Sequence, residues 1–76
     1  MNKQRRKRLT EVMELLQEAQ QIIEEVRDEE QEEFDNLPEG LRCSGRWKAM
    51  EEAINNLEEA YDGMDDTISS VEAAGE

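Results

Sequence analysis

The chain has 76 residues, of which 39% are charged and 36% are hydrophobic, and its formal net charge is −12 with no histidine. A chain this short forms one domain at most and lies near the lower limit of independent stability, so it cannot hold both a large core and a deep catalytic cleft. Its negative charge repels nucleic acid and anionic membranes and favours basic protein partners, although a need for solubility alone also explains it.

Two tracts of apolar residues predict two long helices. In each tract the apolar positions alternate steps of three and four, the heptad pattern of helices that pack along a seam. The first tract is Leu9, Val12, Leu16, Ala19, Ile23 and Val26, and the second is Trp47, Met50, Ile54, Leu57, Tyr61, Met64, Ile68 and Val71. Good helix formers fill most other positions. We therefore expect helices over residues 3–36 and 45–73.

Residues 37–44 are expected to form the loop between these helices. This stretch holds the only proline, Pro38, and it also contains Gly40, which permits backbone angles that other residues avoid. Pro38 is suited to open a single helical turn within the loop, and Ser44 is suited to cap the second helix. A connection this short makes the helices antiparallel neighbours, so the expected fold is an all-α, coiled-coil-like two-helix hairpin.

The two heptads also predict how the helices align. When residue numbers across the seam add to 80, Leu9 lies opposite Val71 and the chain folds over in the middle of the loop. Beside the loop this alignment places acidic residues in the seam of the first helix. There, Phe34 and Leu37 are expected to cover Trp47 instead.

The charges flanking the seam support the same alignment. On one flank it brings Arg6 near Glu72 and Arg27 near Glu51, two pairs of opposite sign. The first helix nevertheless begins with basic residues and ends with acidic ones, which is the reverse of what the helix dipole favours. The hairpin explains the basic start, because it lies beside the acidic end of the second helix, but it leaves the acidic end of the first helix unexplained.

The other flank of the seam is apolar, and we call it the apolar flank. Its members are Leu15 and Ile22 on the first helix and Ala53, Ala60 and Thr67 on the second. A two-helix hairpin has no further helix to cover this flank. The sequence therefore predicts either a homodimer, which would form a four-helix bundle, or a docked partner helix. A lone hairpin with a wider seam is the alternative.

A second candidate interaction site is the acidic end of the first helix, which we call the acidic surface. It consists of Glu24, Glu25, Asp28, Glu29, Glu32, Glu33 and Asp35. One hypothesis is that it binds a basic protein and, by imitating nucleic-acid charge, inhibits a host defence or DNA-binding protein. The short basic segment 3–8 carries no interleaved aromatic residue, so contact with nucleic acid itself is disfavoured.

The residue types offer no basis for catalysis or for a bound cofactor. Histidine is absent, and Cys43 is the only cysteine, which excludes an internal disulfide and a zinc site. The segment from Tyr61 to Asp66 has calcium-binding residue types at the wrong spacing, so we expect no metal site. We expect a non-enzymatic cytoplasmic protein without a membrane span, because a lone thiol suits a reducing compartment and no long apolar run is present.

Two segments carry a resemblance to a known group of proteins. The turn DEEQEEFDNLPE, residues 28–39, and the helix MEEAINNLEEA, residues 50–60, resemble small uncharacterised acidic helical proteins encoded by phages and prophages of Gram-positive bacteria. The resemblance covers about residues 5–72. It implies the cytoplasm of a host cell as the setting and an action on a host protein, and it assigns a role to no individual residue.

Overall fold

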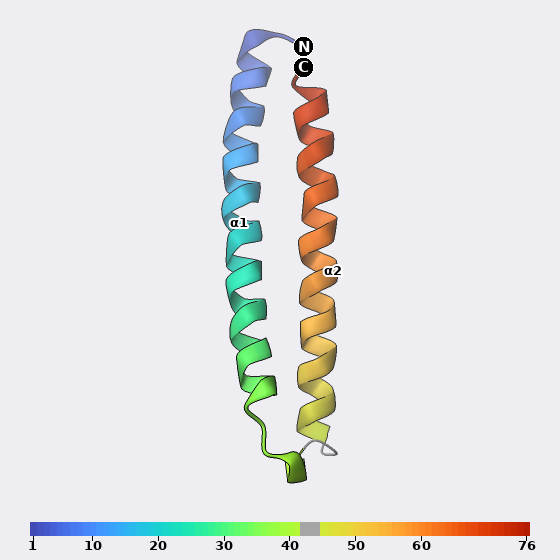
Figure 1. Ribbon diagram of the computed structural model, residues 1–76. Helices are drawn as coiled ribbons and strands as arrows, with labels where there is room; N and C mark the ends of the chain where they lie inside the picture. The colour runs from blue at the N-terminus through green and yellow to red at the C-terminus, as the bar shows by residue number, and fades with distance from the viewer. Residues whose placement is uncertain (42–44) are drawn as a thin grey trace.

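The computed structural model describes residues 1–41 and 45–76 and contains two long helices joined at one end. Helix α1 covers Lys3–Asp35, a 3-10 turn η1 covers Glu39–Leu41, and helix α2 covers Gly45–Ala74. The helices lie side by side in antiparallel directions, so both chain termini lie at the end opposite the connection (Figure 1). The all-α antiparallel hairpin expected from the sequence is therefore confirmed.

The ends of the helices follow from local residues. The side chain of Asn2 accepts a hydrogen bond of 2.8 Å from the backbone N–H of Arg5, which caps α1. After Asn36 the helix stops, and Pro38 opens η1, where the N–H of Leu41 donates to the Pro38 carbonyl at 2.9 Å. The observed ends differ from the expected ranges by one residue, at the end of each long helix. The proposed cap Ser44 and the thiol of Cys43 lie outside the described residues.

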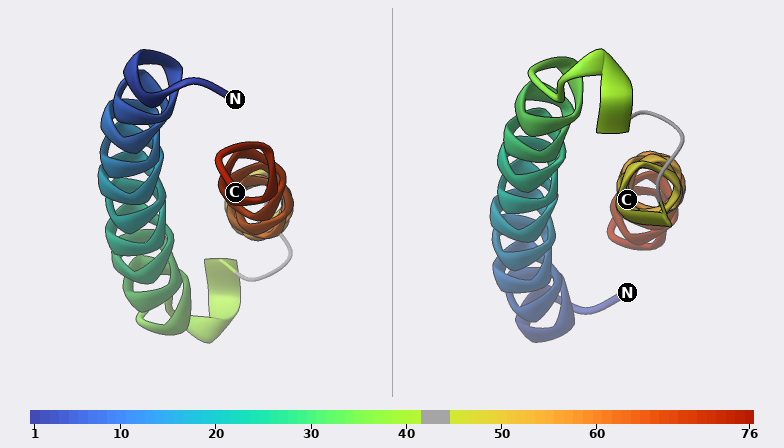
Figure 2. Two further views of the ribbon diagram at one scale, coloured as in Figure 1. Left: turned by 90° about the horizontal axis from the view of Figure 1, so that it is seen from above. Right: turned by 90° about the horizontal axis from the view of Figure 1, so that it is seen from below.

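The molecule is a single layer of two helices, which gives it an extended shape. Its extents are 59 × 14 × 12 Å and its radius of gyration is 17.4 Å, whereas a compact domain of this length would have a radius of about 11 Å. Viewed along α2, α1 runs obliquely to it (Figure 2). Each helix therefore has one neighbour along its whole length.

Helix α2 buries the seam that its heptad predicts. Met50 and Ile54, each with 6% of its surface exposed, are the only buried residues of the described chain. All other seam positions of α2, from Trp47 to Val71, are half-buried. Near the loop, the ring of Phe34 stacks on that of Trp47 with centroids 5.3 Å apart, which agrees with the expectation that Phe34 covers this end.

Helix α1 is rotated about its axis relative to the expected seam. Val12 and Val26, two of the predicted seam residues, are 38% and 43% exposed. Residues one position further along, Met13 and Arg27, are half-buried instead, as is Gln20. The predicted seam is therefore wrong at these positions. The physical reason is that long side chains on this side lay their stems along α2 and bond to it with their polar ends.

Candidate protein-interaction surfaces

The edge of the hairpin onto which α1 is rotated is joined by polar contacts, and we call it the polar edge. The Nε2 group of Gln20 donates to the carbonyl of Tyr61 at 3.2 Å and to Oδ1 of Asp65 at 2.6 Å. The guanidinium of Arg27 donates to Oε1 of Glu58 twice, at 2.7 and 3.2 Å. These contacts connect the two helices along one side.

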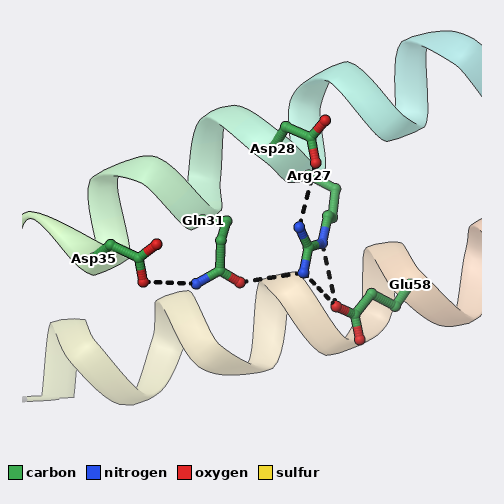
Figure 3. A network of polar contacts seen from close by, with 5 residues as sticks. All are labelled: Arg27, Asp28, Gln31, Asp35 and Glu58. Atoms are coloured by element: carbon green, nitrogen blue, oxygen red, sulfur yellow. Dashed lines mark hydrogen bonds and ion pairs between the residues drawn. The ribbon is translucent and has the colours of Figure 1, made fainter.

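Arg27 is the centre of this edge. It also contacts Asp28 at 3.2 Å and Gln31 at 3.3 Å, and Gln31 in turn donates to Asp35 at 2.9 Å (Figure 3). The hydrogen bond with Glu58, followed by that with Asp28, raises the pKa of Arg27. Arg27, Asp28, Gln31 and Asp35 thus form a continuous row of polar contacts along α1.

The ion pair of Arg27 corrects the predicted alignment of the charges. Its partner on α2 is Glu58, seven residues beyond the expected Glu51. Arg6, which was expected to meet Glu72, donates instead to the carbonyl of Glu76 at 3.5 Å. Both differences have one cause. Side chains of a helix lean toward its N-terminus, so those of α1 reach residues nearer the C-terminus of α2.

A shallow depression of about 360 Å³ lies on the polar edge, between Arg27 and Tyr61. The carboxylate of Glu24 raises the pKa of Tyr61, and partial burial, Asp65 and Asp62 raise it further. Among residues 1–41 and 45–76, no three acidic or sulfur-bearing side chains come together as a metal site.

The apolar flank lies on the opposite edge of the hairpin. On α1, Leu15 and Ile22 lie on the opposite side of the seam from Gln20 and Arg27, which bond to α2, and they are 65% and 52% exposed. Ala60 and Thr67 are also exposed, whereas Ala53 is half-buried. The Thr67 hydroxyl donates to the carbonyl of Gly63 at 3.0 Å, so it is satisfied within its own helix. No described element of the hairpin covers this edge.

The rotation of α1 makes this uncovered edge wider than the sequence predicted. Val12 and Val26 join Leu15 and Ile22 on it, with half-buried Ala19 between them. We call this row the α1 stripe; it consists of Val12, Leu15, Ala19, Ile22 and Val26. Its members alternate steps of three and four, so they form a second heptad seam on the same helix. This periodicity is present in the sequence, but three of the five residues, Val12, Ala19 and Val26, were assigned to the predicted seam.

The acidic surface lies along α1 toward the loop. All seven of its residues are exposed. Among the described residues, Asp28 is its only member in an ion pair, with Arg27. Glu25 and Asp35 accept hydrogen bonds from Gln21 and Gln31, which are neutral and leave their charge in place. Within residues 1–41 and 45–76, ion pairing therefore neutralises only Asp28 on this surface.

Comparisons with known proteins give no match to a family model, to a curated protein or to a solved structure. Within the described residues, no helix is long and apolar enough to cross a membrane. The two surfaces must therefore be interpreted from their own chemistry.

Proposed function

We propose that this chain is a small acidic protein-interaction module that acts by contact rather than catalysis. The observation that carries the proposal is the α1 stripe. Of its five apolar residues at heptad spacing, all but half-buried Ala19 are exposed, on a helix that already packs against a neighbour. Water-exposed apolar rows of this length are costly for a small protein unless another surface covers them. The heptad spacing indicates that the covering element is itself a helix.

The resemblance to phage and prophage proteins supports a setting for this module. We propose that it is phage-encoded and acts in the cytoplasm of a host cell. An extended hairpin of 59 Å presents a long face to a partner at the cost of only 76 residues.

The proposal is tested with a variant that places charge on the α1 stripe, Leu15→Lys/Ile22→Lys. The matched control, Gln17→Lys/Gln21→Lys, adds the same charge to exposed positions on the other faces of α1. Tagged wild type, variant and control are used to capture proteins from host lysate, and the mass of each purified chain is measured. Stripe-dependent association, with itself or with another protein, supports the proposal. Equal association by variant and control would reject it.

A second candidate function is inhibition of a basic, nucleic-acid-binding protein. The observation that favours it is the acidic surface, whose seven exposed carboxylates include one ion pair within the described chain. Binding of this kind weakens steeply with salt. At 1 M salt charges are screened beyond about 3 Å, so a complex that survives this salt would exclude the inhibitor function. A complex that persists when Glu25, Glu29 and Glu32 are changed to Gln would also exclude it.

A further inference from the structure

The α1 stripe continues beyond its apolar residues in both directions. The same steps of three and four lead back to Arg8 and Arg5 and forward to Glu29 and Glu33. All four charged residues are exposed. One row along α1 therefore carries two bases, five apolar residues and two acids, in that order.

A row with this order is complementary to a reversed copy of itself. When two such helices lie antiparallel, the apolar block overlaps itself fully with the two Ala19 residues level. Arg5 and Arg8 of each copy then lie beside Glu29 and Glu33 of the other. We propose that a second copy of this chain covers the α1 stripe in this antiparallel, two-fold arrangement. The inference rests on the proposed function and names the partner as the chain itself.

The two-fold arrangement uses the same patch on both copies, as most soluble homodimers do. Small Ala19 at the centre lets the two α1 helices approach where they cross the axis. Leu15 of each copy then lies level with residues 22 and 23 of the other, and Val12 lies level with Val26. Apolar residues therefore face apolar residues on both sides of the axis.

Two depressions on the surface of the hairpin are compatible with this pairing. A shallow depression of about 410 Å³ lies among Arg5, Arg8, Val12 and Leu15. Another, of about 610 Å³, lies at the loop end and includes Glu29, Glu33 and Arg46 in its wall. The antiparallel arrangement places the basic depression of one copy against the acidic end of the other. Opposite charges therefore meet at both ends of the joint.

Helix α2 leaves room for the second hairpin. After Arg46, which begins this row beside the loop, the edge of α2 that adjoins the apolar flank carries small side chains, which we call the small edge: Ala49, Ala53, Asn56, Ala60, Gly63, Thr67, Ser70 and Ala74. All are uncharged, and nothing lies within 4 Å of the place where a Cβ of Gly63 would sit. A second hairpin can therefore approach both helices, and the result is a four-helix bundle.

The acidic surface decides the direction of the pairing. With the loops at the same end, both acidic surfaces would lie together, and Arg5 and Arg8 of both copies would meet no acid on the other stripe. With the loops at opposite ends, Glu29 and Glu33 of each copy lie beside Arg5 and Arg8 of the other. The pairing also accounts for a charge order along α1 that opposes its dipole. Glu11, Glu18 and Glu25 form an exposed row on α1 just outside the stripe. Their repulsion opposes association at low salt, and added salt screens it.

The first experiment measures the mass of the purified full chain by sedimentation equilibrium over micromolar concentrations. The expected wild-type species is a dimer, and Gln17→Lys/Gln21→Lys behaves like it. Leu15→Lys/Ile22→Lys is expected to weaken dimerisation by at least about a hundredfold, because two apolar side chains lose their cover. A monomeric wild type, or a variant that associates as well as its control, would overturn the inference. A monomeric wild type whose stripe still captures another protein overturns it while leaving the proposed function standing.

The second experiment uses charge and leaves the apolar residues intact, so it remains decisive even where the lysine variant loses helical content. Arg5→Glu/Arg8→Glu and Glu29→Lys/Glu33→Lys are each expected to weaken their own dimer by about tenfold. Mixed in equal amounts, they are expected to form a heterodimer, because both ends of the joint again carry opposite charges. Within one chain Arg5 and Glu33 are roughly 40 Å apart along the helix, so rescue must occur between chains.

The matched controls carry the same charge changes away from the row. Lys3→Glu/Lys7→Glu and Glu14→Lys/Glu51→Lys have the net charges of the two test variants, with their substitutions on exposed positions outside the row. Their mixture is expected to show no preference for the heterodimer beyond the general effect of net charge. A test mixture that shows no more preference than this control would overturn the antiparallel pairing, and a partner other than a second copy would then have to cover the stripe.

Discussion

The two edges of the hairpin differ in how they are completed. On the polar edge, Gln20 and Arg27 reach across to Asp65 and Glu58 and tie the helices together. On the opposite edge, Leu15 and Ile22 lie more than half exposed beside the small edge of α2. One chain thus contains an edge whose polar contacts are made between its own helices and an edge that no described part of the hairpin covers.

The difference shows what limits a two-helix fold. An amphipathic helix carries an apolar stripe wider than a single neighbour can cover. Helix α1 therefore has to expose some of its apolar residues, and its rotation about its own axis decides which ones. Because the stems of Gln20 and Arg27 lie against α2, Val12 and Val26 are the residues that become exposed.

The largest predicted effect concerns the seam that both edges share. Ile54→Ala removes most of a side chain that is 6% exposed, and it is expected to lower the free energy of unfolding by about 2–5 kcal/mol. In a fold with so small a core, that loss unfolds much of the population. Thermal unfolding followed by circular dichroism measures it.

Ile22→Ala is the matched control for the seam, because it removes the same atoms from the exposed edge. At the lowest usable protein concentration, its cost is expected to stay below about 0.5 kcal/mol. The loss of unfolding free energy caused by Ile22→Ala is expected to grow with protein concentration, because a second copy then covers the α1 stripe. Equal losses from Ile54→Ala and Ile22→Ala in dilute solution would mean that the two edges do not differ as described.

A change of opposite sign sharpens the description of the small edge. Gly63 lies in the interior of α2 with open space where a Cβ would sit. Gly63→Ala is therefore expected to raise the free energy of unfolding by about 1 kcal/mol, through helix propensity alone. Ser70→Ala, on the same edge, is expected to gain less. A loss of stability in the dilute Gly63→Ala variant would show that this position is already crowded.

The sequence predicts the hairpin well because both of its determinants are local. The heptads define two helices, and Pro38 with its neighbours separates them. The seam of α2 is also correct, because the row beside Met50, Ile54 and Leu57 on that helix offers only small apolar side chains, such as Ala53 and Ala60, which bury less surface.

The seam of α1 could not be derived in the same way. Leu16 and Ile23 belong to one heptad, while Leu15 and Ile22 belong to another that shares Ala19 with it. Which row faces α2 depends on how far Arg27 reaches and in which direction it leans. The lean of side chains toward the N-terminus of their helix explains why its partner is Glu58 rather than Glu51. The apolar flank expected from the sequence therefore lacked Val12 and Val26.

A smaller effect tests the polar edge directly. Glu58→Gln removes the charge of the carboxylate that accepts from Arg27, and it is expected to lower the thermal midpoint slightly, with a loss that shrinks as salt is added. Glu51→Gln is the matched control, since its carboxylate was the partner expected from the sequence. In double-mutant cycles, the effect of Arg27→Gln is expected to be non-additive with that of Glu58→Gln and additive with that of Glu51→Gln. The reverse result would restore the alignment inferred from the heptads.

The smallest effect is a shift in one titration on the polar edge. The carboxylate of Glu24, with partial burial and two aspartates, raises the pKa of Tyr61. Tyr61 is the only tyrosine, so the absorbance of its phenolate reports this group alone. It is expected to ionise above the ordinary value of about 10, and Glu24→Gln is expected to lower its pKa toward that value. Because the pKa of Tyr61 is raised in the folded state, the stability linked to it is complete below the pKa of the unfolded chain. That stability is lost as the pH rises through the pKa of the folded state.

Glu25→Gln, on the side of α1 away from Tyr61, is the control and is expected to leave the pKa of Tyr61 unchanged. If Glu25→Gln and Glu24→Gln shifted it equally, the cause would be the net charge of the chain, and the polar edge would have no local effect on Tyr61.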